Sequence, residues 1–290
     1  RLSLHTIHIH RRNTRVGNVI MSNFSDFIGG GGSASFPTFF LHKSATWVPP
    51  QDGNIMIHVI GGGGSGSAST STVQLQSGAA GGYCRKNSLA VTTSGSFTVV
   101  VGAGGTPTFH AVGAGTAGGN TTVAGTGLSS TLTATGGAGG ALSSGTYTTG
   151  GVGSNGDFNS NGGRGGSRAG GGAVGLTGTG ADGTAGPVYL YTACGGRCDI
   201  LGDFYSSSLG QISGGIGGQG MTKAQYYDSN GFLHAEPLGG GGSLYSNYDN
   251  SATGGNGSIG GGGGWKFSSG STPLYSGRGG EGCVVIQYIP

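Results

Sequence analysis

Side chains that could perform chemistry are few in this chain and lie far apart in the sequence. His8 and His10 alternate along a short segment, which would place both imidazoles on one side of a strand. They are candidate metal ligands, but we predict no metal and expect an exposed strand in the N-terminal arm instead. Asp199 and Asp203 form the one close acid pair in an aromatic stretch, and a glycosidase needs two acids about 5–9 Å apart. Glycan depolymerisation therefore stays as an alternative. No Ser, His and Asp order stands out, so we predict a non-enzymatic protein without a cofactor.

The cysteines and one glycine motif leave several interpretations open. Cys84, Cys194, Cys198 and Cys283 allow three pairings if all are bridged. Cys194 and Cys198 could close a small loop, a zinc site is an alternative, and free thiols suit a protein made in bacterial cytosol. The segment 113–118 fits G-x-G-x-x-G, but no helix follows it, and such matches arise by chance at this glycine content.

Glycine dominates the composition, with 72 of 290 residues against a usual share of about 7%. It is densest between Gly136 and Gly282. The chain is only 8% charged and contains 11 Phe, 11 Tyr and 2 Trp, which disfavours general disorder. Glycine gathers where a Cβ cannot be tolerated, so we predict closely packed polyglycine-II helices, which share the three-residue turn of polyproline II.

Short segments of alternating, β-branched residues predict an all-β fold with little or no α-helix. Their spacing indicates a small β-sandwich or jelly roll, closed by the final apolar segment at the C-terminus. The expected strands are Thr46–Val48, Ile55–Ile60, Thr72–Gln76, Leu89–Thr92, Phe97–Val101, Thr121–Ala124, Thr131–Thr135 and Cys283–Ile289.

We expect three regions: an N-terminal arm or attachment segment over 1–44, the sandwich over 45–140 closed by 283–290, and the glycine bundle with exposed loops over 141–282. The loops carry aromatic residues among Ser, Gly and Asn, a composition typical of recognition surfaces, although some rings must instead cover the bundle. The predicted binding residues are Tyr189, Tyr191, Phe204, Tyr205, Tyr226, Tyr227, Phe232, Tyr245, Tyr248, Trp265 and Tyr275.

The order of four sequence elements resembles the glycine-rich domain of bacteriophage tail-fibre and adhesin proteins. Trp47-Val-Pro-Pro leads into a strand and glycine run ending at Gly64, and the similarity extends over roughly 45–290. The other matching elements are Ala80–Lys86, Ser96–Gly105, Thr133–Gly140 and Gly282–Tyr288.

The resemblance implies a virion protein at a tail fibre or other external appendage, made in the host cytoplasm. It implies that distal loops bind a bacterial outer-surface protein or glycan, beside other virion proteins and in a homo-oligomer such as a trimer. In a threefold fibre, His8 and His10 of three chains could hold an iron ion. The alternative is a structural virion protein, such as a fibre shaft, head fibre or capsid decoration. An ice-binding protein would need a regular face of Thr or Ala, which the sequence pattern does not reveal.

Neither nucleic acid nor a membrane is an expected partner. The net charge is +3, and the basic residues concentrate in the N-terminal arm without interleaved aromatic residues elsewhere. No apolar run approaches the roughly 18 residues of a membrane span.

Overall fold

The computed structural model describes residues 20–21, 37–70, 75–109, 112–142, 147–166, 170–172, 180, 182–183, 256–257, 259–264, 266–267 and 275–290. These residues contain strands and no helix, as the sequence predicted. The longer strands are β2 (Thr38–Leu41), β3 (Ala45–Trp47), β4 (Gly53–Ile60), β6 (Tyr83–Val91), β7 (Phe97–Val100), β8 (Thr121–Gly125), β9 (Leu132–Ala134), β12 (Phe158–Ser160) and β15 (Cys283–Ile289). Two-residue strands are β1 (Ile20–Met21), β5 (Ala68–Ser69), β10 (Tyr147–Thr148), β11 (Gly153–Ser154), β13 (Gly165–Gly166) and β14 (Lys266–Phe267).

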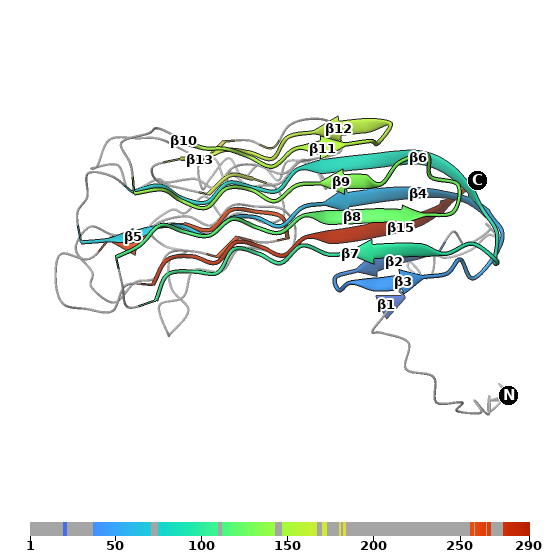
Figure 1. Cartoon of the computed structure of the whole chain (residues 1–290), viewed down its shortest axis with the longest axis horizontal. Coiled ribbons are helices and arrows are strands. Elements are labelled where there is room, and N and C mark those ends of the chain that lie inside the picture. Colours follow the sequence, from blue (N-terminus) through green and yellow to red (C-terminus); the bar gives the residue numbers. More distant parts are fainter. Residues whose placement is uncertain are drawn as a thin grey trace, which may run out of the picture.

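Two antiparallel sheets form a β-sandwich at one end of the molecule (Figure 1). The six-stranded sheet has the order β1-β2-β15-β4-β6-β12, and the five-stranded sheet has the order β11-β9-β8-β7-β3. Alternate residues of each strand point between the sheets, where Ile55, Ile57, Phe97 and Val123 are fully buried. The period-two pattern seen in the sequence is therefore the pattern of the sandwich core.

The last strand closes the sandwich from its centre rather than from its edge. β15 pairs with β4 from Cys283↔Ile60 to Ile289↔Asn54, and on its other side it pairs with β2. The hydroxyl of Tyr288 donates a hydrogen bond of 2.7 Å to the carbonyl oxygen of Gln51. The prediction that the C-terminal segment pairs with early strands is confirmed.

The strands continue beyond the sandwich as long, regular glycine-rich segments, which together we call the glycine lattice (Figure 1). Every third N–H of the segment 61–68, starting at Gly61, donates to the antiparallel segment 75–82. The N–H groups one position further along donate to 113–119, and those two positions further donate to 277–280. Three donor directions in three residues are the hydrogen-bonding pattern of polyglycine II, so the predicted packing is present in these segments. Most of the predicted bundle over 141–282 lies outside the described residues.

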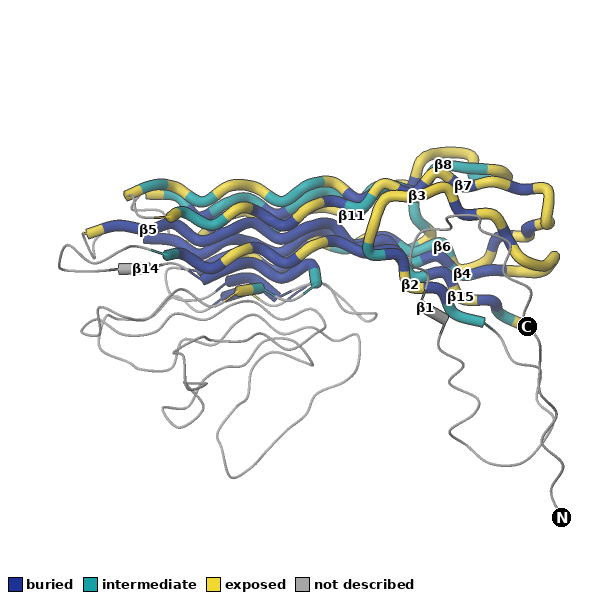
Figure 2. Tube along the Cα trace, turned by 90° about the horizontal axis from the view of Figure 1, so that it is seen from below, coloured by how far each residue is buried: buried dark blue, intermediate teal, exposed yellow. Residues whose placement is uncertain are grey.

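Six segments surround 61–68 completely. The three that receive its N–H groups alternate with segments containing Gly105, Gly137 and Gly263, whose N–H groups donate to carbonyls of 61–68. This packing leaves no room for a side chain at most positions: a Cβ added to Gly63 would lie 2.0 Å from the carbonyl oxygen of Gly261. Figure 2 accordingly shows the inner segments buried along their length.

The lattice draws on residues both before and after position 140. The segments 61–68, 75–82, 102–105 and 113–119 belong to it and directly follow or precede sandwich strands. The predicted strand Thr72–Gln76 lies partly outside the described residues, and Leu75 and Gln76 lie in the lattice rather than in a strand. Sandwich and lattice therefore alternate along the sequence, because the strands β4, β6, β7, β8, β9 and β15 each run into or out of a glycine segment.

Candidate functional site

Most of the predicted binding residues lie outside the described residues. Tyr275 is described, and it is half-buried. The metal candidates His8 and His10, the acid pair Asp199 and Asp203, and ten predicted binding residues fall outside: Tyr189, Tyr191, Phe204, Tyr205, Tyr226, Tyr227, Phe232, Tyr245, Tyr248 and Trp265.

The part of the chain that the structure describes offers no metal cluster of three or more His, Cys, Asp or Glu side chains. Within it, no helix could cross a membrane. The segment 113–118, which fits a nucleotide-binding motif, is a lattice strand: Gly115 and Gly118 donate their N–H groups to the carbonyls of Gly140 and Gly137. These donors are therefore not available to a phosphate.

Two of the four cysteines are described, Cys84 and Cys283, and both side chains are buried. Cys84 pairs in register with Val59, and Cys283 pairs with Ile60. Burial raises the pKa of the Cys84 thiol to about 11. A thiol with this pKa stays protonated near pH 7, and the thiolate is the reactive form. Cys84 is therefore a packing residue rather than a nucleophile.

The end of the lattice farthest from the sandwich (Figure 1), which we call the distal end, carries exposed apolar side chains. Its exposed side chains are Phe109, Val112, Leu142 and Tyr147, between 37% and 55% accessible. They follow or precede lattice segments at the points where those segments stop. Exposed aromatic and aliphatic side chains on a rigid support are a common feature of binding surfaces.

One corner of the distal end is an aromatic pair. Phe109 and Tyr275 form an isolated antiparallel bridge, and their rings meet edge to face with centroids 5.7 Å apart. The backbone N–H of Thr108 donates to the hydroxyl oxygen of Ser276 at 2.9 Å. Main-chain and side-chain bonds thus hold the two rings together.

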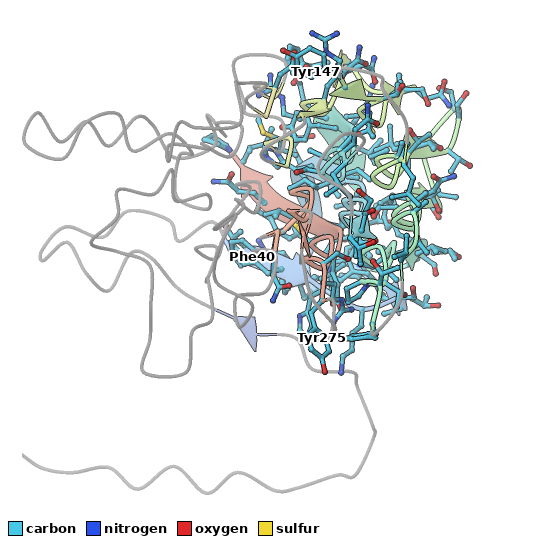
Figure 3. The ribbon with its side chains drawn as sticks, turned by 90° about the vertical axis from the view of Figure 1, so that its left-hand side faces the viewer. Phe40, Tyr147 and Tyr275 are labelled. Carbon is cyan, nitrogen blue, oxygen red and sulfur yellow. The ribbon has the colours of Figure 1, made fainter. Side chains whose placement is uncertain are left out.

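Tyr147 occupies another corner, well separated from Tyr275 in the view onto the distal end (Figure 3). The guanidinium carbon of Arg164 lies 4.3 Å from the centre of the Tyr147 ring. Asp182 accepts hydrogen bonds from Nε of Arg164 at 2.9 Å and from Nη2 at 2.6 Å. Contact with Asp182 raises the pKa of Arg164, so this guanidinium stays charged.

The outer face of the six-stranded sheet holds a second polar cluster. His58 and the hydroxyl of Tyr83 are hydrogen bonded at 2.7 Å, and Arg85 lies over the ring of Phe158 at 5.5 Å. Burial, together with the charge of Arg85, lowers the pKa of His58 to about 4. His58 is therefore neutral near pH 7.

One outer layer of the lattice carries small side chains at regular intervals. It consists of 113–120, 135–142 and 147–152, which are joined by hydrogen bonds such as Gly118 N–H to Gly137 and Ala138 N–H to Thr149. Its exposed small residues include Ala114, Ala117 and Thr149. This spacing cannot be predicted from the sequence, because the three segments become neighbours only in the fold.

A family of glycine-rich domains matches residues 40–289, which include both the sandwich and the lattice. This chain belongs to the glycine-rich domain family. No curated protein matches the chain. In this glycine-rich domain, the sequence prediction overlooked Phe109, Tyr147 and Arg164. The available signal was their position: each interrupts or borders a glycine run with a large side chain.

Proposed function

We propose that this glycine-rich domain is a phage virion adhesin that binds a bacterial surface receptor from the distal end of its lattice. The observation that carries the proposal is that the distal end exposes Phe109, Val112, Leu142 and Tyr147 on a support of closely hydrogen-bonded backbone. A rigid support lowers the ordering cost of binding, and Tyr and Trp are the side chains that most often anchor interfaces.

The similarity of Trp47-Val-Pro-Pro and the following strand to phage tail-fibre proteins supports the virion setting. In this proposal, the chain is made in the host cytoplasm, is not an enzyme, and assembles with other fibre or tail proteins, as a homo-oligomer such as a trimer. The partner is an outer-surface protein or glycan, and neither nucleic acid nor membrane insertion is involved.

The test is adsorption of the labelled, purified chain to a panel of bacterial strains, measured by flow cytometry. We expect binding to at least one strain, and loss of that binding when Tyr226, Tyr227, Tyr245 and Tyr248 are replaced by Ala. A matched control is Thr98→Ala on the exposed face of the sandwich. Undiminished adsorption of the four-residue variant would remove these loops from the site.

A structural virion protein without receptor contact is the alternative. Immunolabelled virions viewed by negative stain separate the two, because an adhesin lies at a fibre tip and a decoration protein lies along a shaft or on the capsid. The regular layer containing Ala114, Ala117 and Thr149 also favours a check for ice binding. Thermal hysteresis of the purified chain measures that activity directly, and its absence would exclude it.

A further inference from the structure

The Tyr147 corner is built more rigidly than an ordinary exposed aromatic residue. The backbone of Tyr147 pairs with Gly166, and the hydroxyl of the next residue, Thr148, donates to the carbonyl oxygen of Ser77 at 2.8 Å. Arg164 stacks on one face of the ring, which still leaves the side chain 37% exposed. A ring held in this way loses little conformational freedom when a partner packs against it.

Arg164 is itself held by Asp182 at three points. Besides the two guanidinium hydrogen bonds, the backbone N–H of Arg164 donates to Asp182 at 2.7 Å. Arg164 lies between Gly163 and Gly165 in a lattice segment. Of these three residues only Arg164 has a side chain, which projects from the segment. The carboxylate offsets the guanidinium charge, so the charges of these two described residues cancel at this corner.

We propose that Tyr147 is the stacking platform of a binding site for a neutral sugar ring. The apolar C–H face of a hexopyranose matches the exposed surface of one tyrosine ring. Beside that ring, Arg164 and Asp182 supply donors and acceptors to hydroxyl groups. Within the described part of the chain, the Nη1 group of Arg164 has no hydrogen-bond partner and can donate to a ligand.

Because the charges of Arg164 and Asp182 cancel, the ligand that fits this corner is a neutral rather than an acidic sugar. An acidic sugar needs an uncompensated cation, whereas the charge of Arg164 is already paired with Asp182. A protein partner needs a central apolar cluster, but Tyr147 and the Phe109 pair lie in separate parts of the distal end (Figure 3). Tyr147 stacks against the sugar ring, and Arg164 and Asp182 both hold the tyrosine ring in place and contact the sugar hydroxyls. This inference rests on the proposed function, because it names a glycan as the class of receptor.

The test uses the full chain and methyl glycosides of glucose, galactose, mannose and N-acetylglucosamine, with methyl glucuronide as the acidic comparison. Ring resonances of Tyr147 are followed by NMR titration. We expect at least one neutral glycoside to shift them, with an affinity on the order of millimolar, and Tyr147→Ala to weaken binding by at least about tenfold. Tyr147→Phe retains the binding because it keeps the ring.

Two further variants separate a specific site from general stacking. Phe40→Ala removes an exposed ring from β2 of the sandwich, outside the distal end, and leaves glycoside binding unchanged. Arg164→Gln leaves the tyrosine in place, and we expect it to weaken binding by about fivefold and to broaden the Tyr147 ring resonances. Urea unfolding of each variant checks that it folds. The glycoside titration of the unsubstituted chain tests the site independently of any substitution.

Three results would overturn the proposal: no neutral glycoside shifts Tyr147, binding survives Tyr147→Ala, or methyl glucuronide binds more tightly than every neutral glycoside. A parallel measurement of cell adsorption distinguishes failure of the sugar-site proposal from failure of the adhesin proposal. Adsorption without glycoside binding rejects the sugar site and leaves an adhesin that binds protein. Glycoside binding that depends on Tyr147, in a chain that adsorbs to no strain, supports the site and rejects the adhesin.

Discussion

Replacing Gly64 by alanine should sharply destabilise the lattice. Gly64 lies in the segment 61–68, which six neighbours surround, and its added Cβ would sit 2.1 Å from the carbonyl oxygen of Ala138. A side-chain carbon essentially never lies closer than 3.0 Å to such an atom, so the segment containing Ala138 must recede by about 0.9 Å.

That displacement breaks specific hydrogen bonds. The N–H groups of Gly137 and Gly140 donate to the carbonyls of Gly62 and Ser65 at 2.9 and 2.8 Å, and a shift of this size moves them beyond hydrogen-bond range. Two lost bonds cost about 1 kcal/mol each, and overpacking adds about 1–3 kcal/mol. We expect Gly64→Ala to lower the free energy of unfolding by about 3–5 kcal/mol.

Urea unfolding followed by circular dichroism measures the effect, and Gly95→Ala is the matched control. Gly95 lies in a sandwich turn, where an added Cβ would be 3.1 Å from the Thr92 carbonyl oxygen and 3.7 Å from the next atom, the Cβ of Thr126. We expect it to change stability by less than about 1 kcal/mol. Equal midpoints for the two variants would refute the argument that backbone contact, rather than glycine content, sets the stability of the lattice.

Three other predictions concern titratable groups. Cys84 and Cys283 should resist iodoacetamide at pH 8 in the folded chain and react in denaturant, as measured by peptide mapping, because both thiols are buried. The lowered pKa of His58, about 4 against 6.5 when unfolded, means that the unfolded state binds a proton first as the pH falls. Stability should therefore be complete above pH 6.5 and decline by up to about 3 kcal/mol toward pH 4, and His58→Gln should flatten this decline in urea titrations. Asp157→Asn removes the exposed 2.8 Å ion pair with Lys86, and thermal melts should show a loss below about 1 kcal/mol that shrinks further in high salt.

Local sequence patterns predicted the sandwich strands well, because each strand carries its own alternation. Cys283–Ile289 was predicted with the bounds that the structure has, and Ile55–Ile60 was short by two residues at Gly53 and Asn54. The strand Thr38–Leu41 was missed. It is only four residues long, and its role depends on pairing with β15 from the other end of the chain.

The candidate site could not be predicted in the same way. Phe109 and Tyr275 are 166 positions apart in the sequence, and Tyr147, Arg164 and Asp182 come from three separate segments. Lattice segments run side by side in a fixed register, so their ends lie together at the distal end. The contacts between these residues follow from that arrangement. No local pattern of residues records which ends become neighbours.

The sequence by itself determined the two kinds of segment in this domain. These are strands with alternating β-branched residues, and glycine runs that exclude side chains. Both follow from local chemistry, since side-chain alternation sets a half-buried strand and the absence of a Cβ allows polyglycine-II packing. Only the tertiary structure decided that the glycine runs before position 140 and those after it form one lattice, so that one segment crosses both sandwich and lattice. It also decided that Arg164 lies over Tyr147, because that contact depends on hydrogen bonds between backbones far apart in the chain.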